Sequence, residues 1–182
     1  IWVTNQLAAT VTKLRAANGA LLSTVAVGTN PFGSAYDGEH LWVANSGSNT
    51  VTKIRVRDDA IIGAFAVPNQ PFMMAYDGTD MWVTNRLGST VSRLSTATGA
   101  VLNTYAVGST PVGIAFDGAN MWVANQGGNS ITKLRASDGL NLGTFAVGTF
   151  PLGVCFDGQD IWVTNQGANT VMRLDTNGNV LN

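Results

Sequence analysis

Short runs of hydrophobic residues, separated by polar turns, return along the whole chain with a period of 40 residues. Within residues 111–148 the runs are VGIAF, MWVANQ, SITKLR and LNLGTFAV, each rich in β-branched and aromatic residues. Runs of this kind, bounded by turn residues, predict β-strands. None of the longer stretches has apolar side chains at helical spacing. The pattern therefore predicts four strands in each unit, which we call A, B, C and D in chain order.

The B strands carry the clearest sign of the repeat. They read IWVTNQ, LWVANS, MWVTNR, MWVANQ and IWVTNQ, and the repeats begin near residues 1, 41, 81, 121 and 161. Asp-Gly pairs between strands A and B indicate tight turns, because Gly adopts positive φ at little steric cost. A fixed period of this length indicates a solenoid, propeller or array. Four antiparallel strands per repeat favour a propeller.

We therefore predict an all-β fold, a β-propeller of four-stranded antiparallel blades with about 4.5 repeats of 40 residues present. Residues 1–182 would form a single propeller domain or a fragment of one. The first repeat lacks strand A, and the last has only NVLN to begin strand D. Because these ends do not complement each other, we expect no ordinary ring closure and possible self-association through unpaired blade edges. The explanation that we favour is a segment of a longer propeller of about six or seven blades. The alternatives are a five-bladed ring with two incomplete blades and association between chains that covers the exposed edges.

A Trp residue occupies the same position in every B strand: Trp2, Trp42, Trp82, Trp122 and Trp162. Identical placement in a repeated strand favours packing between neighbouring blades. The alternative is a set of stacking platforms for sugars or bases. Apolar residues on both faces of one C strand, such as Ile131 and Leu134, also indicate blades that are covered on both sides.

The charge pattern excludes some partners. Only 12% of the residues are charged, against about 25% in a usual soluble domain, and 10 basic residues face 11 acidic ones. Nucleic-acid binding requires a basic footprint, and a membrane helix requires about 18 consecutive apolar residues. We expect neither partner. All basic residues except Arg86 lie on or beside C strands, where we expect a solvated outer wall, the alternative being an electrostatic docking surface.

Candidate catalytic chemistry is sparse. The single histidine, His40, lies in a predicted A–B turn, where we expect it to be solvated. Nucleophile elbows, HExxH helices and Cys or His ligand clusters are absent from the sequence. The Asp-Gly carboxylates come one to a blade, whereas a metal site draws several oxygens together. We therefore predict no catalytic residue, metal or cofactor. Cys155 replaces the alanine of other repeats, so we expect a small buried side chain.

The segment VGTFPLGVCFDGQDIWVTNQGANTVMRLDTNGNVL resembles the YVTN-type propeller repeat, with Trp where that family usually has Tyr. It is equally similar to the repeats of virginiamycin B lyase-like and NHL-type propellers. These groups include bacterial surface and periplasmic proteins, binding scaffolds and an antibiotic-degrading lyase. The lyase resemblance implies several histidines, a carboxylate and a magnesium ion. Because His40 is the only histidine, no catalytic position is carried over.

The B–C and D–A loops are expected to share one face, and they vary more than the near-identical Asp-Gly turns of the other face. Variable loops on a rigid scaffold are where binding usually occurs, although unconstrained drift is the alternative. We expect a non-catalytic, periplasmic or extracellular scaffold that binds a protein, peptide or glycan. The alternative is a fragment of a virginiamycin B lyase-like enzyme whose catalytic residues lie outside this chain. The ligand-facing candidates are Asn30, Asn69, Gln70, Met73, Arg86, Thr110 and Phe150.

Overall fold

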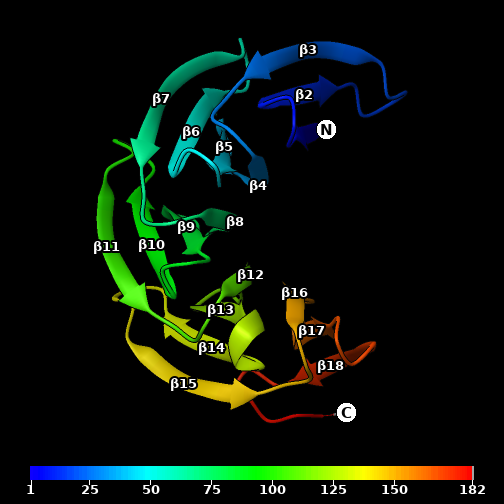
Figure 1. The fold of residues 1–182 in the computed structure, drawn as a ribbon, viewed down its shortest axis with the longest axis vertical. Coiled ribbons are helices and arrows are strands. Elements are labelled where there is room, and N and C mark those ends of the chain that lie inside the picture. The colour runs from blue at the N-terminus through cyan, green and yellow to red at the C-terminus, as the bar shows by residue number, and fades with distance from the viewer. Residues whose placement is uncertain (182) are drawn as a thin grey trace.

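The computed structural model describes residues 1–181, which form five antiparallel sheets arranged as an arc of blades (Figure 1). The first blade contains β1 (Trp2–Asn5), β2 (Thr10–Leu14) and β3 (Leu21–Ala26), and the second β4 (Pro31–Tyr36), β5 (His40–Asn45), β6 (Thr50–Arg55) and β7 (Ala60–Ala66). The third contains β8 (Pro71–Tyr76), β9 (Asp80–Asn85), β10 (Thr90–Ser95) and β11 (Val101–Ala106). The fourth contains β12 (Pro111–Phe116), β13 (Asn120–Asn125), β14 (Ser130–Arg135) and β15 (Asn141–Ala146), and the fifth β16 (Pro151–Phe156), β17 (Ile161–Asn165) and β18 (Thr170–Leu174).

The predicted all-β propeller architecture is confirmed. Strands β4, β8, β12 and β16 lie nearest the centre of the arc, and β3, β7, β11 and β15 lie at its periphery (Figure 1). The helical content of residues 1–181 is one 3₁₀ turn, η1 (Gln126–Gly128), in a B–C loop. None of the described residues forms a helix long and apolar enough to cross a membrane.

The arc is open between the first blade and the last (Figure 1). Strands β16, β17 and β18 form a sheet of their own, as do β1, β2 and β3. Up to residue 181, the only trace of a fourth strand in the last blade is a single bridge between Leu174 and Val180. Within the described residues, the last strand therefore does not pair with the first blade. This agrees with the prediction from the sequence that ordinary ring closure is absent.

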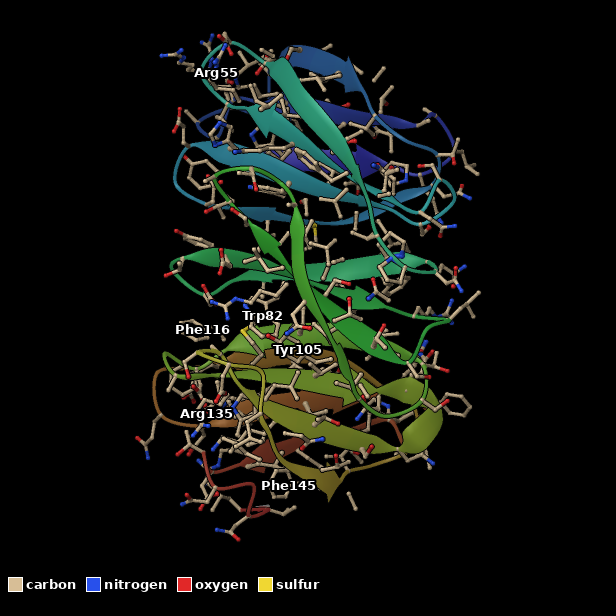
Figure 2. The ribbon with its side chains drawn as sticks, turned by 90° about the vertical axis from the view of Figure 1, so that its left-hand side faces the viewer. Arg55, Trp82, Tyr105, Phe116, Arg135 and Phe145 are labelled. Atoms are coloured by element: carbon tan, nitrogen blue, oxygen red, sulfur yellow. The ribbon has the colours of Figure 1, made fainter. Side chains whose placement is uncertain are left out.

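The repeated Trp residues form the packing between blades, as predicted. Trp42, Trp82 and Trp122 are each 0% exposed. Trp82 stacks on Tyr105 at 5.3 Å between ring centroids, and both lie in a cluster with Phe116 of the next blade (Figure 2). These rings are inaccessible in the intact blades, so they cannot act as stacking platforms for a ligand.

Residues on both faces of one strand pack against different neighbours. Ile131 joins the cluster around Trp122 and the fifth blade, and Leu134 joins the cluster around Trp82 and the third. Both are 0% exposed. The prediction that each blade is covered on both sides is confirmed for blade four.

Each Asp-Gly carboxylate does more than mark a turn. One oxygen of Asp117 accepts hydrogen bonds from the backbone N–H groups of Ala119 and Asn120, at 2.8 and 2.6 Å. The other accepts the indole N–H of Trp122 at 2.7 Å. The same Trp–Asp bond of 2.7 Å recurs in the second, third and fifth blades. The Asp therefore connects the A–B turn to the ring that fills the gap between blades.

The expectation of a solvated wall is wrong for the three lysines that keep the repeat register, Lys13, Lys53 and Lys133. Lys53 is only 4% exposed, and its ammonium group lies 5.0 Å from the centroid of the Trp42 ring. It donates a hydrogen bond to the carbonyl of Thr96, in the next blade, at 2.6 Å. Lys13 and Lys133 make the equivalent contacts. The long aliphatic stems allow these cations to cross between blades and cover a Trp ring.

These hydrogen bonds predict a loss of stability in acid. Burial alone would raise the pKa of Asp117, but the bonds from Trp122 and the turn backbone lower it below 3.8. The backbone N–H of Asp160, followed by the Trp162 indole, lowers the pKa of Asp157 to about 2. A lowered pKa contributes stability above the unfolded value of 3.8, and this is lost as pH falls through the folded value.

We therefore expect the urea midpoint of the wild-type chain to fall between about pH 4 and pH 2. Asp117→Asn should have a lower urea midpoint than the wild type at pH 7. Its midpoint should also fall less on acidification, because the variant lacks one of the carboxylates whose protonation is coupled to unfolding. Urea unfolding at a series of pH values, followed by Trp fluorescence, is the measurement. Equal slopes against pH in the two proteins would contradict the assignment.

The outer faces of the two end blades expose residues whose equivalents are buried elsewhere. In the last blade Val171 is 57% exposed and Trp162 is half-buried, and in the first blade Ile1 is 63% exposed. Cys155 is also exposed, so the expectation of a buried side chain is wrong. The physical reason is that its alanine counterparts each face a following blade, whereas the face of β16 that carries Cys155 is open.

Self-association through these faces stays a prediction. We expect the sedimentation coefficient of the chain to rise with concentration, because the exposed face of blade five repeats the apolar surface that packs between blades elsewhere. Val171→Asp should abolish the rise, whereas Val101→Asp on the outer strand β11 should not. A wild-type coefficient that is independent of concentration would show the prediction to be wrong.

Candidate functional site

The B–C loops and the D–A loops meet on one face of the arc, which we call the channel face. The two kinds of loop are joined by backbone hydrogen bonds in each blade junction. The N–H of Arg86 donates to the carbonyl of Gln70 at 2.9 Å, and the N–H of Gln126 donates to that of Thr110 at 2.9 Å. The equivalent bonds from Ser46 and Gln166 are 3.0 Å long. The loops are thus held in fixed positions around the inner strands.

The residue that accepts each of these bonds has a left-handed backbone. The φ angles are +49° at Asn30, +59° at Gln70, +55° at Thr110 and +50° at Phe150. Asn tolerates this conformation, but Gln, Thr and Phe do so at a cost of order 1–3 kcal/mol. These four positions thus carry side chains, although Gly would adopt the same backbone conformation at a lower cost. The left-handed backbone points these side chains out of the D–A loops.

A cavity of about 250 Å³ lies where the channel face meets the inner strands, and we call it the channel-mouth cavity. Every blade contributes to it. Its rim is polar and its floor is apolar, with side chains from β4, β8, β12 and β16 in the floor. The rim residues are Gln6, Asn30, Ser46, Gln70, Arg86 and Gln126, and the floor residues are Phe32, Phe72, Val112 and Leu152.

Arg86 is the charged side chain of this cavity. Its guanidinium carbon lies 5.4 Å from the centroid of the Phe72 ring, a cation–π geometry. Its Nη2 donates to Oε1 of Gln126 at 3.3 Å. Phe72 in turn stacks on Phe32 at 3.8 Å between centroids, which makes the floor rigid. The guanidinium is therefore held in place by neutral groups only.

Two polar atoms of the cavity are buried without a hydrogen-bond partner: Nε of Arg86 and Oε1 of Gln70. One is a donor and the other an acceptor. Leaving buried polar groups unpaired costs about 1–3 kcal/mol each, and more when the group is charged. A ligand that offers both an acceptor and a donor would satisfy them.

The two faces of the molecule differ in charge. The loops of the channel face contain no Asp or Glu, and Arg86 is their only charged side chain. The acidic residues lie in or beside the A–B and C–D turns, which form the opposite, Asp-Gly face. Figure 2 shows Arg55 and Arg135 towards one edge of the molecule, where each pairs with an Asp of its own C–D turn. The channel face is therefore the more positive one, although the chain carries a net charge of −1.

Two larger hollows lie between blades on the Asp-Gly face, but their buried cations already have hydrogen-bond partners. One has a volume of about 410 Å³ and includes Arg93, which donates to Asp80 at 2.8 Å and to the carbonyl of Ser137 at 3.1 Å. Another, of about 380 Å³, includes His40 and Lys53. The channel-mouth cavity is smaller but presents unpaired groups, so we take it as the candidate site.

The structure brings three of the seven ligand-facing candidates together, because Asn30, Gln70 and Arg86 all line the channel-mouth cavity. The other four lie apart from it. Thr110 and the exposed Phe150 lie in D–A loops, and Asn69 is exposed in another. Met73 lies in β8 and packs in the clusters between blades.

Three rim residues were missed by the sequence reasoning: Gln6, Ser46 and Gln126. Each follows the Asn that ends a B strand, which is also the repeat position of Arg86. Residues in one repeat position lie on one ring around the propeller axis, so this register was the available signal. The prediction from the sequence selected only Arg86 at this repeat position, because it differs from its uncharged counterparts.

His40 is not a solvated turn residue, and that expectation is corrected. It begins β5, its side chain is 13% exposed, and its Nδ1 lies 3.5 Å from an oxygen of Asp37. The physical reason is that His40 is a strand residue paired with Arg55 of β6, so its ring is held against the Asp37 carboxylate. Residues 1–181 contain no cluster of three or more His, Cys, Asp or Glu side chains with metal-binding geometry.

No protein-family model matches the sequence, and no curated protein matches it. The structure is similar to several solved ones. A streptogramin B lyase structure superposes with a TM-score of 0.86 at 21% identity, over 98% of this chain and 63% of that one. A catalytically inactive virginiamycin B lyase from Staphylococcus aureus, solved with quinupristin, gives 0.83 at 22% identity, over 98% and 64%. A functionally unknown protein from Desulfotomaculum acetoxidans gives 0.84 at 17% identity, over 98% and 63%.

The chain thus spans 63–64% of the length of these proteins. Identities of this size show the fold and leave activity open. The resemblance of the repeat is nevertheless borne out at the level of architecture. The chain has the fold of a virginiamycin B lyase-like β-propeller.

Proposed function

We propose that this chain is a non-catalytic binding propeller that holds a peptide, or a peptide segment of a protein partner, in the channel-mouth cavity. The observation that supports this most is the pair of buried, unpartnered atoms, Arg86 Nε and Gln70 Oε1. They lie in a cavity to which every blade contributes. Rigid scaffolds that present a few convergent polar groups over an apolar floor are the usual form of a binding site.

The chemistry of the rim favours a peptide over a glycan. Gln6, Gln70 and Gln126 each carry an amide donor and an amide acceptor, which match the N–H and C=O groups of a peptide backbone. The apolar floor accepts a side chain. A glycan would stack on exposed aromatic rings, but the rings that line this cavity, Phe32 and Phe72, stack on each other at 3.8 Å, and Phe72 is only 9% exposed.

Selection from a displayed library of random peptides, with the immobilised chain as bait, tests this function. Ser46→Trp places a bulky ring at the rim and should abolish binding of the selected peptides. The matched control is Thr79→Trp, which adds the same ring on the Asp-Gly face and should leave binding unchanged. Binding that is lost in Thr79→Trp and kept in Ser46→Trp would overturn the proposal, as would selection of glycans from an array and of no peptide.

A second candidate function is that of a lyase-like enzyme, in which this chain forms part of the propeller and the catalytic residues lie outside it. The superposition on streptogramin B and virginiamycin B lyase structures favours this candidate. Incubation of the protein with quinupristin, followed by liquid chromatography and tandem mass spectrometry, discriminates between the two. A new chromatographic product with an altered fragment pattern would support the lyase candidate over the binding one, and its mass need not change because an elimination that opens a ring loses no atoms.

We also propose that the protein acts in the periplasm or outside the cell. The low content of charged residues and the similarity of its repeats to YVTN-type repeats support this location. Fractionation of the source cells with an antibody against the chain is the test. Recovery of the protein in the cytoplasmic fraction alone would contradict it.

A further inference from the structure

We propose that Arg86 binds a carboxylate group of the ligand, so that the channel-mouth cavity selects acidic peptides. This inference rests on the proposed function, because it names the chemical class of ligand for the same site. The guanidinium is always charged, and it presents its donors in a planar fork that matches a carboxylate. Its position and its surroundings carry the argument.

The first step concerns the charge balance of the cavity. Arg86 is half-buried, yet none of the residues that line the cavity is acidic. Elsewhere in the fold a partly buried guanidinium has a carboxylate partner, as Arg93 has in Asp80 at 2.8 Å. A partly buried charge without a counter-ion is costly, so the site favours any ligand that supplies a negative charge.

The second step concerns the donors of Arg86. Of these, Nη2 already donates to Gln126, whereas Nε has no partner and is covered by neighbouring atoms. A ligand therefore reaches Nε when a side chain at the rim moves aside. A carboxylate that meets the Nε edge would accept one hydrogen bond there and a second from the adjacent Nη atom. The guanidinium carbon also lies 5.4 Å from the centroid of the Phe72 ring, and this contact restricts the side chain. Arg86 is therefore ordered in advance, which lowers the entropy lost on binding.

The third step concerns Gln70, which lies beside Arg86 because their backbones are hydrogen-bonded at 2.9 Å. Its unpartnered Oε1 is an acceptor and disfavours a second anion at that point. An N–H group next to the carboxylate would satisfy it. A carboxylate adjacent to an amide N–H is the arrangement at the end of a peptide chain, and it occurs near Asp and Glu side chains as well.

Two small probes, N-acetyl-L-alanine and its neutral amide, test the inference while the natural ligand is unidentified. In ¹⁵N-labelled protein the Arg86 Nε–H signal reports binding directly. We expect N-acetyl-L-alanine to shift this signal saturably, and the amide to bind about tenfold or more weakly. In variants that lack this side chain, the backbone amide signals of Gln70 and Gln126 report binding instead. Arg86→Gln should weaken binding of the acid by a similar factor, and Arg86→Lys should bind with an affinity between those of the wild type and Arg86→Gln, because it keeps the charge and loses the fork.

The matched control is Arg57→Gln, which removes a guanidinium that is 73% exposed and should leave binding unchanged. Equal binding of the acid and the amide by the wild-type chain would overturn the inference, as would unchanged binding in Arg86→Gln. If either of these results is found and peptides from the display selection still bind at the rim, the proposed function stands and only the carboxylate assignment fails. If the acid binds at Arg86 and no peptide is selected, the carboxylate assignment stands and the proposed function fails.

Matched versions of a selected peptide identify the source of the carboxylate. A loss of affinity on amidation of the C-terminus assigns it to the chain end, and a loss on Glu-to-Gln replacement assigns it to a side chain. Either result supports the inference. Galacturonate that binds more tightly than N-acetyl-L-alanine would overturn the peptide assignment in favour of an acidic sugar.

Discussion

Replacement of Trp82 by Ala is expected to lower the free energy of unfolding by about 3–5 kcal/mol. The ring is 0% exposed, stacks on Tyr105 at 5.3 Å and packs in a cluster that includes Ile114 and Met121 of the next blade. The substitution would leave a cavity between two blades that cannot close without moving both. Urea unfolding followed by circular dichroism is the measurement.

Trp162→Ala is the matched control for this prediction. Its indole donates to Asp157 at 2.7 Å, as that of Trp82 does to Asp77, but the ring is only half-buried on the open face of blade five. Both variants lose a Trp–Asp hydrogen bond of the same length, so most of the difference between them reports packing. We expect a loss of about 1–2 kcal/mol for Trp162→Ala. Equal losses would contradict packing between blades, and a Trp82→Ala variant of normal stability that binds no ligand would restore the stacking-platform interpretation.

Gly113→Ala is expected to destabilise the chain by about 1–3 kcal/mol. Gly113 lies in β12, where the inner strands of blades four and five come closest, and an added Cβ would overlap the backbone carbonyl of Leu152. A backbone atom of the neighbouring strand cannot rotate away as a side chain can. The whole inner-strand contact must therefore shift, which we expect to widen the channel-mouth cavity as well.

Gly153→Ala is the control at the equivalent position of the next blade. There the added Cβ would meet only Thr164 Oγ1 at 3.0 Å and Cγ2 at 3.8 Å, because that face of blade five is open. We expect a change of less than about 1 kcal/mol. Both variants are compared by urea unfolding at neutral pH. A larger loss in Gly153→Ala than in Gly113→Ala would contradict the close approach of inner strands as the cause.

The fold was predictable because every repeat carries the same signals. The Trp, the Asp-Gly turn and the apolar runs recur with one period, and each repetition is independent support for the same blade. The role of the Asp-Gly carboxylate as acceptor for the Trp indole was not predicted, although the constant separation of Asp117 and Trp122 contained it. An Asp before Gly is explained by turn formation alone, so its bond to the indole leaves no separate signal in a single repeat.

The exposure of the lysines was mispredicted for a different reason. Lys53 does lie on a C strand, as predicted, but its side chain contacts Trp42 and the carbonyl of Thr96 in the next blade. Contacts between blades depend on how the sheets stack, which strand periodicity does not specify. The exposure of Cys155 likewise depends on which blade faces have a neighbour.

The candidate site was predictable in part. The choice of the B–C and D–A loops selected Asn30, Gln70 and Arg86, which converge on one cavity. The floor was not predicted, because Phe32 and Phe72 look like ordinary inner-strand residues in the sequence. Their stacking at 3.8 Å arises from two different blades. The two rings meet only when the blades are arranged around the propeller axis, and the sequence of one repeat does not specify that arrangement.

The most direct test of the binding site is a crystal structure of the chain with a peptide selected by display. We expect the peptide in the channel-mouth cavity, with a carboxylate oxygen about 2.7–2.9 Å from Nε of Arg86. We also expect an N–H group of the peptide at hydrogen-bond distance from Oε1 of Gln70. A peptide bound on the Asp-Gly face, with Arg86 and Gln70 unchanged and free of contact, would contradict the assignment of the site.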